Sequence, residues 1–388
     1  MSRSHQQDLQ LTCKNVAVGD EGYFKTFFNS LLPQSIRWTY LHIDKRLLQF
    51  IPSNLPLIRV HSLVLNHVQD SFQGGLCAIP PIFPNLRVFG GANAIPMFTT
   101  YPSSLTTCVL SWHGMRLRVI PLLTCLAHLV SVRTLTLCIG DDYPSDLPQD
   151  SPTPTHTLLC TMPNVVTVSV RFDGEFKWRI VKGIFSFLVL PKLDDATISF
   201  RKCTTADGLL DVLEVLRRLV RLSNRPFQNV HTLCVDVVEC EDSSVREADI
   251  LKLLLEPLPT VRDLTINIPT AEFAGSCVVQ SDGDSATRPT EVTRNQFSSL
   301  ETLRLINCHH LTERKLRALA KNLWNNTPSN GLQLLEVIEC REISEVFLLE
   351  LSSIMGDSLK WNFPSWRRRK ESSDDDCITA SSRTQKAS

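Results

Sequence analysis

Only a few residues of this 388-residue chain combine types and spacings that could do chemistry. Cys308 is followed directly by His309 and His310, and thiolate and imidazole are the usual ligands of structural zinc. Adjacent residues point apart in a strand or turn, and no second group of cysteine and histidine lies nearby to complete four ligands. The pattern therefore favours structural roles for these residues, and we expect no metal site.

Signatures of the common active sites are absent from the sequence. It contains no Gly-x-Gly-x-x-Gly, no Walker loop, no Gly-x-Ser-x-Gly and no His-Glu-x-x-His. We therefore expect a protein that is not an enzyme and that binds no cofactor.

A polar segment near the end of the sequence carries charged groups. Trp366 is followed by the basic run 367–370, which is typical of a nuclear localisation signal or an anion-binding patch, although short charge runs are usually solvated. Ser372 and Ser373 precede three aspartates, so they are candidate substrates of an acidophilic kinase. The aspartates at 374–376 are more simply solvated residues of a serine-rich tail than metal ligands.

Composition and charge exclude several classes of partner. The chain has 40 Lys and Arg against 40 Asp and Glu, whereas nucleic-acid-binding domains carry a basic patch or stripe. No apolar run reaches the roughly 18 residues of a membrane span, and the first residues lack the apolar core of a secretory signal. The 13 cysteines include no Cys-x-x-Cys pair, which is typical of reduced thiols. We expect no nucleic acid, no membrane, and a cytoplasmic or nuclear location.

Leucine is abundant because one apolar pattern recurs along the chain. About 55 residues are leucine and only 15 are glycine. The pattern is an apolar residue, two others, a second apolar residue, one other and a third apolar residue. Its copies begin at Trp38, Val60, Leu86, Leu105, Val132, Val165, Leu193, Val230, Val261, Leu300 and Leu332. The intervals run from 19 residues (86 to 105) to 39 residues (261 to 300). Leucine-rich repeats have periods of about 20–29 residues, so the longer intervals are expected to contain a full helix or a loop insertion.

The elements of each unit follow from this spacing. The last two apolar positions lie two residues apart and face one side of a strand, while turn residues such as Pro191 precede the copy. We expect a first strand within 8–18, and helices at 23–32, 206–223 and 243–255. The expected domains are a polar N-terminus (1–9), a repeat region (10–360) with loop insertions near 141–156 and 270–295, and a disordered tail (361–388).

Twelve residues flank the second and third apolar positions and would line the concave face of such a repeat array. They are mostly small and polar, whereas the residues that dominate protein interfaces are usually Trp, Tyr and Arg. The pattern therefore does not indicate a strong partner-binding site, and an ordinary solvated sheet face explains it equally well. These residues are Asn66, Ser111, Thr136, Ser169, Arg171, Thr197, Ser199, Asp236, Thr265, Asn267, Arg304 and Glu336. Trp112 and Trp178 are further candidates, but large aromatic residues favour the core.

The last two copies share a longer pattern. Cys308 and Cys340 follow the third apolar residue at the same distance, and Thr312 and Ser344 stand four residues further on. This resembles the cysteine-containing leucine-rich repeat of F-box proteins, in which the Cys packs after the strand and the Thr or Ser caps a helix. More diffusely, residues 10–360 resemble the repeat region of the large F-box families of mushroom-type fungi.

The resemblance implies a fold and a function. The fold is an α/β leucine-rich-repeat solenoid, curved, with a parallel inner sheet and with helices and loops outside. The function is a protein-interaction module like the substrate-recognition region of an F-box subunit of a cullin-RING ubiquitin ligase. Its bound protein is not identified by the sequence.

The F-box itself, a helical motif that begins with Leu-Pro and docks the ligase adaptor, is not detectable. Leu32 and Pro33 are the early candidate, but the residues after them have the pattern of a strand. We therefore expect the adaptor to be a partner only if an F-box is present upstream. The alternative is a stand-alone leucine-rich-repeat scaffold or truncated gene product with no ubiquitin-ligase role.

Overall fold

The chain divides into two compact units, each of which is mixed α/β and built on parallel strands. Unit 1 contains residues 1–244 and 254–261, and unit 2 contains residues 245–253 and 262–388. The computed structural model describes residues 8–13, 21–52, 55, 57–66, 75–113, 117–140, 159–205, 212–222, 226–238, 250–271, 273, 299–324 and 331–362.

Among the described residues of unit 1, nine parallel strands follow one another in chain order across the sheet. They are β1 (Leu9–Cys13), β2 (Trp38–Asp44), β3 (Ser62–Asn66), β5 (Val88–Ala92), β7 (Thr107–His113), β8 (Thr134–Gly140), β10 (Thr167–Phe176), β12 (Asp195–Thr205) and β13 (Thr232–Val238). Parallel neighbours need crossover connections. Two small parallel sheets form in these crossovers, β4 (Gly75–Ile79) with β6 (Ala94–Phe98) and β9 (Cys160–Thr161) with β11 (Leu188–Val189).

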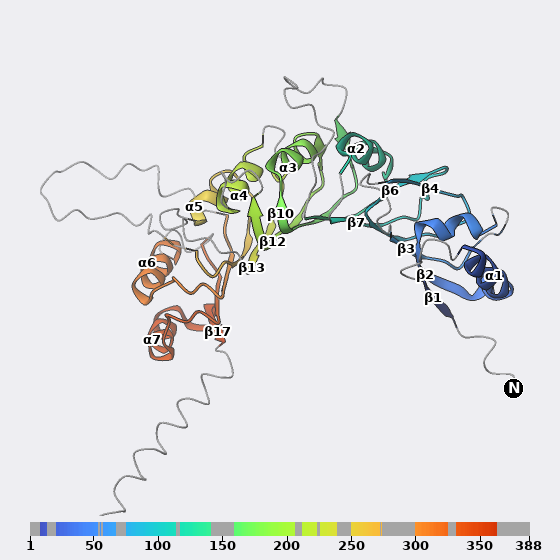
Figure 1. The fold of residues 1–388 in the computed structure, drawn as a ribbon. Coiled ribbons are helices and arrows are strands. Elements are labelled where there is room, and N and C mark those ends of the chain that lie inside the picture. Colours follow the sequence, from blue (N-terminus) through green and yellow to red (C-terminus); the bar gives the residue numbers. More distant parts are fainter. Residues whose placement is uncertain are drawn as a thin grey trace, which may run out of the picture. The chain divides into compact units, whose positions relative to one another are not determined.

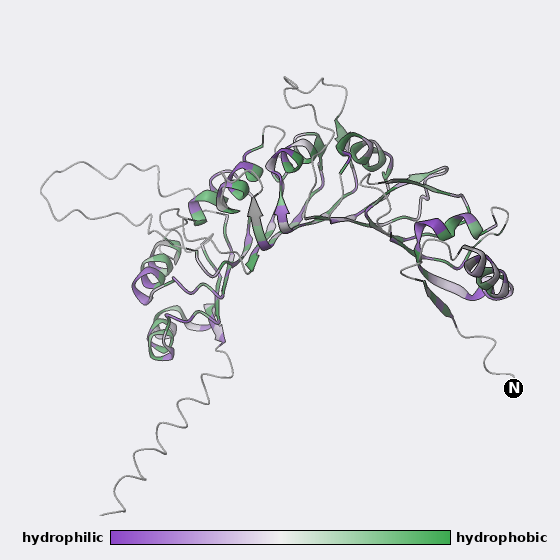
Figure 2. Ribbon diagram, viewed as in Figure 1, coloured by the Kyte–Doolittle hydropathy of each residue, from purple (hydrophilic) through white to green (hydrophobic). Residues whose placement is uncertain are grey.

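Helices occupy one side of the unit 1 strands. Figure 1 shows α2 (Val119–His128), α3 (Trp178–Phe185) and α4 (Val212–Val220) above β7, β10 and β12. Green and purple alternate around α4 in Figure 2, as expected for an amphipathic helix that buries one stripe. Near the start of the unit are α1 (Glu21–Leu31) and the 3-10 helices η2 (Leu32–Arg37) and η3 (Lys45–Phe50).

Unit 2 repeats the same strand and helix alternation. Its described strands are β14 (Asp263–Asn267), β15 (Thr302–Ile306), β16 (Leu334–Ile338) and β17 (Leu359–Asn362), paired in parallel in that order. Its helices are α6 (Glu313–Trp324) and α7 (Glu345–Met355), followed by the 3-10 turn η6 (Gly356–Ser358), while α5 (Ile250–Leu255) precedes β14 in the sequence. No helix in the described ranges is both long and apolar enough to cross a membrane.

A turn precedes most strands and fixes where each begins. The first apolar residue of a copy donates its backbone N–H to the carbonyl three residues earlier, as Leu193 does to Leu190 (3.2 Å) and Val230 to Phe227 (3.2 Å). These first apolar residues are fully or almost fully buried. The turn therefore inserts one side chain into the core before the strand inserts two more.

Polar side chains tie each turn to the turn before it. Asn85, Asn164 and Asn229 stand directly before the first apolar residue of their copies, and each donates an amide hydrogen bond backward. The acceptors are Ile58 O (2.8 Å), Val130 O (2.9 Å) and Pro191 O (3.1 Å). Ser104 and Thr260 take the same position, and their hydroxyls bond Leu86 O and Val230 O at 2.8 Å. Backbone carbonyls that would lack a strand partner are satisfied in this way.

Strands predicted from the repeat are present in the structure. A strand begins two residues after each predicted copy, except at Trp38, where β2 begins at that residue. The expected helix at 206–223 is described only as α4, and that at 243–255 only as α5. The predicted insertion at 141–156 and most of 270–295 lie outside the described residues. Trp361 and Asn362, assigned to the tail by the sequence, belong to β17.

Aromatic rings fill the middle of the unit 1 core. Phe172 and Phe200 occupy paired positions of β10 and β12, and their ring centroids lie 4.9 Å apart. Trp112 is fully buried, although its indole Nε1 has no hydrogen-bond partner among the described residues. Trp178 is 9% exposed, so both tryptophans belong mainly to the core, as predicted.

Candidate functional site: the open face of the strands

Alternation along the unit 1 strands leaves one set of side chains outside the core. In β7, Cys108, Leu110 and Trp112 are buried, whereas Ser111 and its alternating neighbours are half-buried. The buried set packs under α2, α3 and α4, which lie on one side of the strands (Figure 1). We call the opposite, half-buried side of these strands the open face.

Five of the predicted residues fall in one continuous row on the open face. Register pairing connects Asn66, Ala92, Ser111, Cys138, Arg171, Ser199 and Asp236 across seven strands from β3 to β13. We call this set the polar row. Ser199 is the least open of the predicted members, at 8% exposed, so its hydroxyl offers less surface than the sequence pattern suggests.

Three more predicted residues form a second row one step earlier along the strands. Thr136, Ser169 and Thr197 are paired side by side on β8, β10 and β12, and Val109 and Cys234 flank them on β7 and β13. All three are half-buried, so their hydroxyl groups reach the surface without long flexible stems. We call these three residues the hydroxyl row.

The other four predicted residues belong to unit 2 and form their own arrangement. Thr265, Arg304 and Glu336 are paired in register across β14, β15 and β16, and Arg304 forms an ion pair with Glu336. Asn267 lies two positions further along β14, where its amide oxygen accepts a hydrogen bond from Asn307 Nδ2 (3.1 Å). The predicted residues are therefore brought together as two separate sets.

A group of charged side chains at the ends of β10 and β12 was not predicted from the sequence. Arg171 Nε donates to Asp173 Oδ2 at 2.7 Å, and Asp173 is paired in register with the exposed Arg201. Burial raises the pKa of the Cys138 thiol beside them, against the positive charge of Arg171. In the sequences of β10 and β12, the alternation of apolar and polar residues continues past the third apolar position of the copy. This continuation is the sequence signal that could have indicated the longer strands and their charged ends.

Glycine is required where the open face is most crowded. A Cβ built on Gly140 would lie 2.3 Å from the carbonyl oxygen of Asp173 and 3.0 Å from His113 Nδ1. Gly140 stands between these two residues in the strand register. Only glycine lets β8 approach β10 this closely, so the charged strand ends are held at short range.

Several predicted residues already have partners within the chain. Asn66 Nδ2 lies 2.8 Å from His42 Nε2. Asp236, at the other end of the polar row, also has an interaction within the chain. Such contacts fix side-chain positions before any partner arrives, which lowers the entropy lost on binding.

In the Cys308, His309 and His310 group, the cysteine has a structural contact. The Cys308 thiol is buried and donates to the carbonyl of Ile266 at 3.7 Å. Burial lowers the pKa of His309, and its Nδ1 has no hydrogen-bond partner among the described residues. Within the described ranges, no group of three or more His, Cys, Asp or Glu is placed to hold a metal ion.

Cys203 repeats this arrangement in unit 1, although the repeat pattern did not predict it. Its thiol donates to Phe172 O at 3.1 Å, just as Cys340 donates to Leu305 O at 3.6 Å. All three thiols bond a carbonyl of the preceding strand. The role of the cysteine is therefore to satisfy backbone oxygen at the strand end, a weak but buried hydrogen bond.

Comparison with known proteins adds no relative. The sequence matches no protein-family model, and it matches no curated protein. What the open face can do chemically follows from its side chains: short hydroxyls that donate and accept hydrogen bonds, bordered by an Arg–Asp pair and further charges of both signs.

Proposed function

We propose that this chain is a protein-interaction module, a leucine-rich-repeat solenoid like the substrate-recognition region of an F-box subunit of a cullin-RING ubiquitin ligase. It would bind a segment of another protein on the open face of unit 1. It would act by binding rather than by catalysis. The free state of the ten described cysteines supports a reducing location, the cytosol or the nucleus.

The observation that carries this proposal is the polar row with the hydroxyl row beside it. Hydroxyl, amide and charged groups stand at regular strand spacing, about 4.8 Å from one strand to the next. A bound protein segment that crosses these strands would meet a hydrogen-bonding group on most of them, with Ala92 on β5 as the exception in the polar row. Because these groups lie on paired strands, binding does not require the loss of entropy that ordering a loop would cost.

Charge supports a protein partner more than a nucleic acid. Arg171 and Arg201 on the face are balanced by Asp173 and Asp236, so this surface has no excess positive charge. Affinity for a phosphate backbone rests on several uncompensated Lys or Arg contacts. Alternating charges of both signs suit the electrostatic complementarity of a protein surface, which selects one register of binding.

A two-residue blocking variant tests the role of the open face. Partners would be captured from the source cells by cross-linking to the full chain, and one partner would then be purified. Ser169→Arg with Thr197→Arg should weaken its binding about tenfold or more, because two long side chains would cover the hydroxyl row. Ile120→Arg, at an exposed position on α2, is the matched control.

The outcomes separate clearly. Loss of binding in the blocking variant with retention in Ile120→Arg supports the proposal. Equal binding by both variants would move the interaction to another surface and overturn it. Circular dichroism of each variant would confirm that the strands and helices still form.

The ligase role is tested separately from the binding role. If the chain belongs to an F-box subunit, the full-length gene product should co-purify with the ligase adaptor under conditions that recover a known F-box protein. Failure of that co-purification, together with retained partner binding, would support the alternative, a stand-alone scaffold without a ubiquitin-ligase role.

A further inference from the structure

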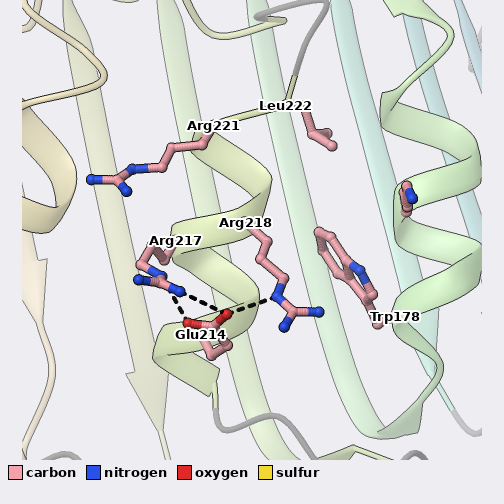
Figure 3. Close-up of a pocket in the computed structure, with 7 residues that line it drawn as sticks. Trp178, Glu214, Arg217, Arg218, Arg221 and Leu222 are labelled. Carbon is pink, nitrogen blue, oxygen red and sulfur yellow. Dashed lines mark hydrogen bonds and ion pairs between the residues drawn. The ribbon is translucent and has the colours of Figure 1, made fainter.

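A hollow of about 430 Å³ lies between α3 and α4 on the helix side of unit 1. Figure 3 shows Trp178 on one side and the arginines of α4 on the other. Trp178 and Leu222 are the apolar residues of the lining, and at 9% and 8% exposed each offers a small part of its side chain to the hollow. The volume is within the range of about 300–1,000 Å³ that is usual for small-ligand sites.

Positive charge dominates the rim of this hollow. Its lining includes four cationic side chains, Lys182, Arg217, Arg218 and Arg221, and one carboxylate, Glu214. Arg221 pairs at 3.0 Å with Glu256, which lies outside the lining. Among the described residues, four cations against these two carboxylates leave an excess of two positive charges.

Glu214 holds two of the arginines in place. Its carboxylate lies 2.7 Å from Arg217 Nε and 2.7 Å from Arg218 Nε, and Figure 3 shows both guanidinium groups converging on it. Burial alone would raise the pKa of Glu214, but the hydrogen bonds from the two arginines outweigh burial and hold the pKa below its ordinary value. Glu214 is therefore ionised at neutral pH and fixes the direction of both arginines.

Donor capacity remains after these pairings. Glu214 engages Nε of Arg218 and Nε and Nη2 of Arg217, only part of the five N–H donors on each guanidinium. Lys182 approaches the same hollow from α3, and its ammonium group makes no hydrogen bond or ion pair with any residue in the described ranges. Donors from two helices thus surround one space in which the described lining residues supply fewer anions than cations.

We propose that the hollow between α3 and α4 binds a phosphomonoester, a doubly charged phosphate group attached to a small organic moiety. Arginine forks match the geometry of phosphate oxygens, and lysine adds a point charge. Two excess positive charges equal the charge of the phosphate dianion, which has a second pKa of about 6. The organic moiety would rest against Trp178 and Leu222.

This site is independent of the proposed function, because it lies on the helix side and uses none of the open-face residues. Its ligand could be a free phosphorylated metabolite or a phosphorylated side chain of another protein. Both share the phosphomonoester chemistry, and the test below distinguishes them.

Titration calorimetry of the full chain at low ionic strength tests the site. The probes are O-phosphoserine, serine, a phosphoserine peptide and the same peptide without phosphate. Lys182→Gln with Arg218→Gln should weaken binding of the phosphorylated probes about tenfold or more, because charge-assisted hydrogen bonds are lost. Arg133→Gln with Arg179→Gln removes two exposed unit 1 cations outside the hollow and should leave affinity within about twofold.

The pH dependence gives a second readout. Affinity should rise from pH 5 to pH 7, as the phosphate group loses its second proton at about pH 6. Equal affinity for O-phosphoserine and the phosphopeptide would point to a small metabolite, and tighter binding of the peptide would point to a protein; both support the site.

Two results would overturn the proposal. One is the absence of binding by both phosphorylated probes at millimolar concentration. The other is an equal loss in the two double variants, which would show bulk charge rather than a site. If the variant at Lys182 and Arg218 unfolds, Lys182→Glu alone provides the same test, since Lys182 has no partner among the described residues to lose.

Discussion

Glu313, the first residue of α6, accepts a hydrogen bond from the backbone N–H of Ser344 at 3.0 Å and a second one from the Ser344 hydroxyl. Ser344 in turn accepts from the backbone N–H of Phe347 at 3.2 Å, and so caps α7. One side chain of α6 therefore fixes the residue that starts the next helix. Both Ser344 and the equivalent Thr312 were predicted as caps, and both carry cap bonds.

Removing this cap should destabilise unit 2. Ser344→Ala loses the bond to Phe347 N–H, and we expect the free energy of unfolding to fall by about 1 kcal/mol. Urea denaturation followed by circular dichroism measures the change. Ser353→Ala, near the end of the same helix, is the control and should have a smaller effect, since its hydroxyl bonds only a carbonyl within the helix. Equal effects would contradict the cap role.

Acid should weaken the Glu214 cluster. The pKa of this carboxyl is lowered in the folded chain, against 4.5 as the ordinary value, so its contribution to stability is complete above that value. The contribution is lost as pH falls through the lower folded pKa. We expect the stability difference between wild type and Glu214→Gln to be present at pH 7 and to shrink toward pH 3.

Denaturation at a series of pH values measures this difference. Glu345→Gln, at an exposed position in the first turn of α7, is the matched control for loss of a carboxylate. A difference at Glu214 that stays constant from pH 7 to pH 3 would show that the arginine contacts do not stabilise the folded chain.

Two glycines should respond in opposite ways to alanine. Gly140→Ala places a methyl group 2.3 Å from Asp173 O, so a strand must shift, and we expect a loss of about 1–3 kcal/mol. Gly22 lies in α1 with no atom within 4 Å of an added Cβ, so Gly22→Ala should stabilise by up to about 1 kcal/mol through helix propensity. Thermal unfolding of both variants checks the contrast, and similar shifts would refute it.

Thiol alkylation should follow burial. Burial raises the pKa of Cys125 and of Cys160 to about 12, so neither supplies thiolate at pH 8, whereas Cys13 and Cys234 are half-exposed. Among the ten described cysteines, we expect iodoacetamide to label Cys13 and Cys234 first in the folded protein. Mass spectrometry of peptides after timed labelling gives the order, and unfolding in urea should remove it. Early labelling of Cys125 would contradict the packing of α2.

The repeat pattern predicted the strands because burial, turn chemistry and spacing agree at each copy. At Val230, for example, a turn residue, a buried side chain and a strand start all follow from local sequence. Helix α2 was not predicted, because its residues are nearly all apolar and no side chain caps it at Arg118. Strand β6 contains Pro96, which argues against a strand from sequence alone.

The candidate site was predicted only in part for a related reason. Which side chains share the open face follows from the two-residue period, and Thr136, Ser169 and Thr197 do lie side by side. Each copy was defined by three apolar positions, so the extension of β10 past them to Phe176 was not predicted, although the alternation of its residues continues there. The hollow is formed by residues of both α3 and α4. It could not be predicted because no local sequence pattern shows that these two helices lie side by side.

The hydrogen bonds between successive turns confine variation in chain length to one side of each unit. Asn164 joins its turn to Val130 before it and to Lys192 after it, so this side cannot gain a residue without losing a bond. Spacing between copies nevertheless varies from 19 to 39 residues, and the difference falls in the return segments. For protein engineering, an epitope tag or a second domain should therefore be inserted away from these hydrogen-bonded turns.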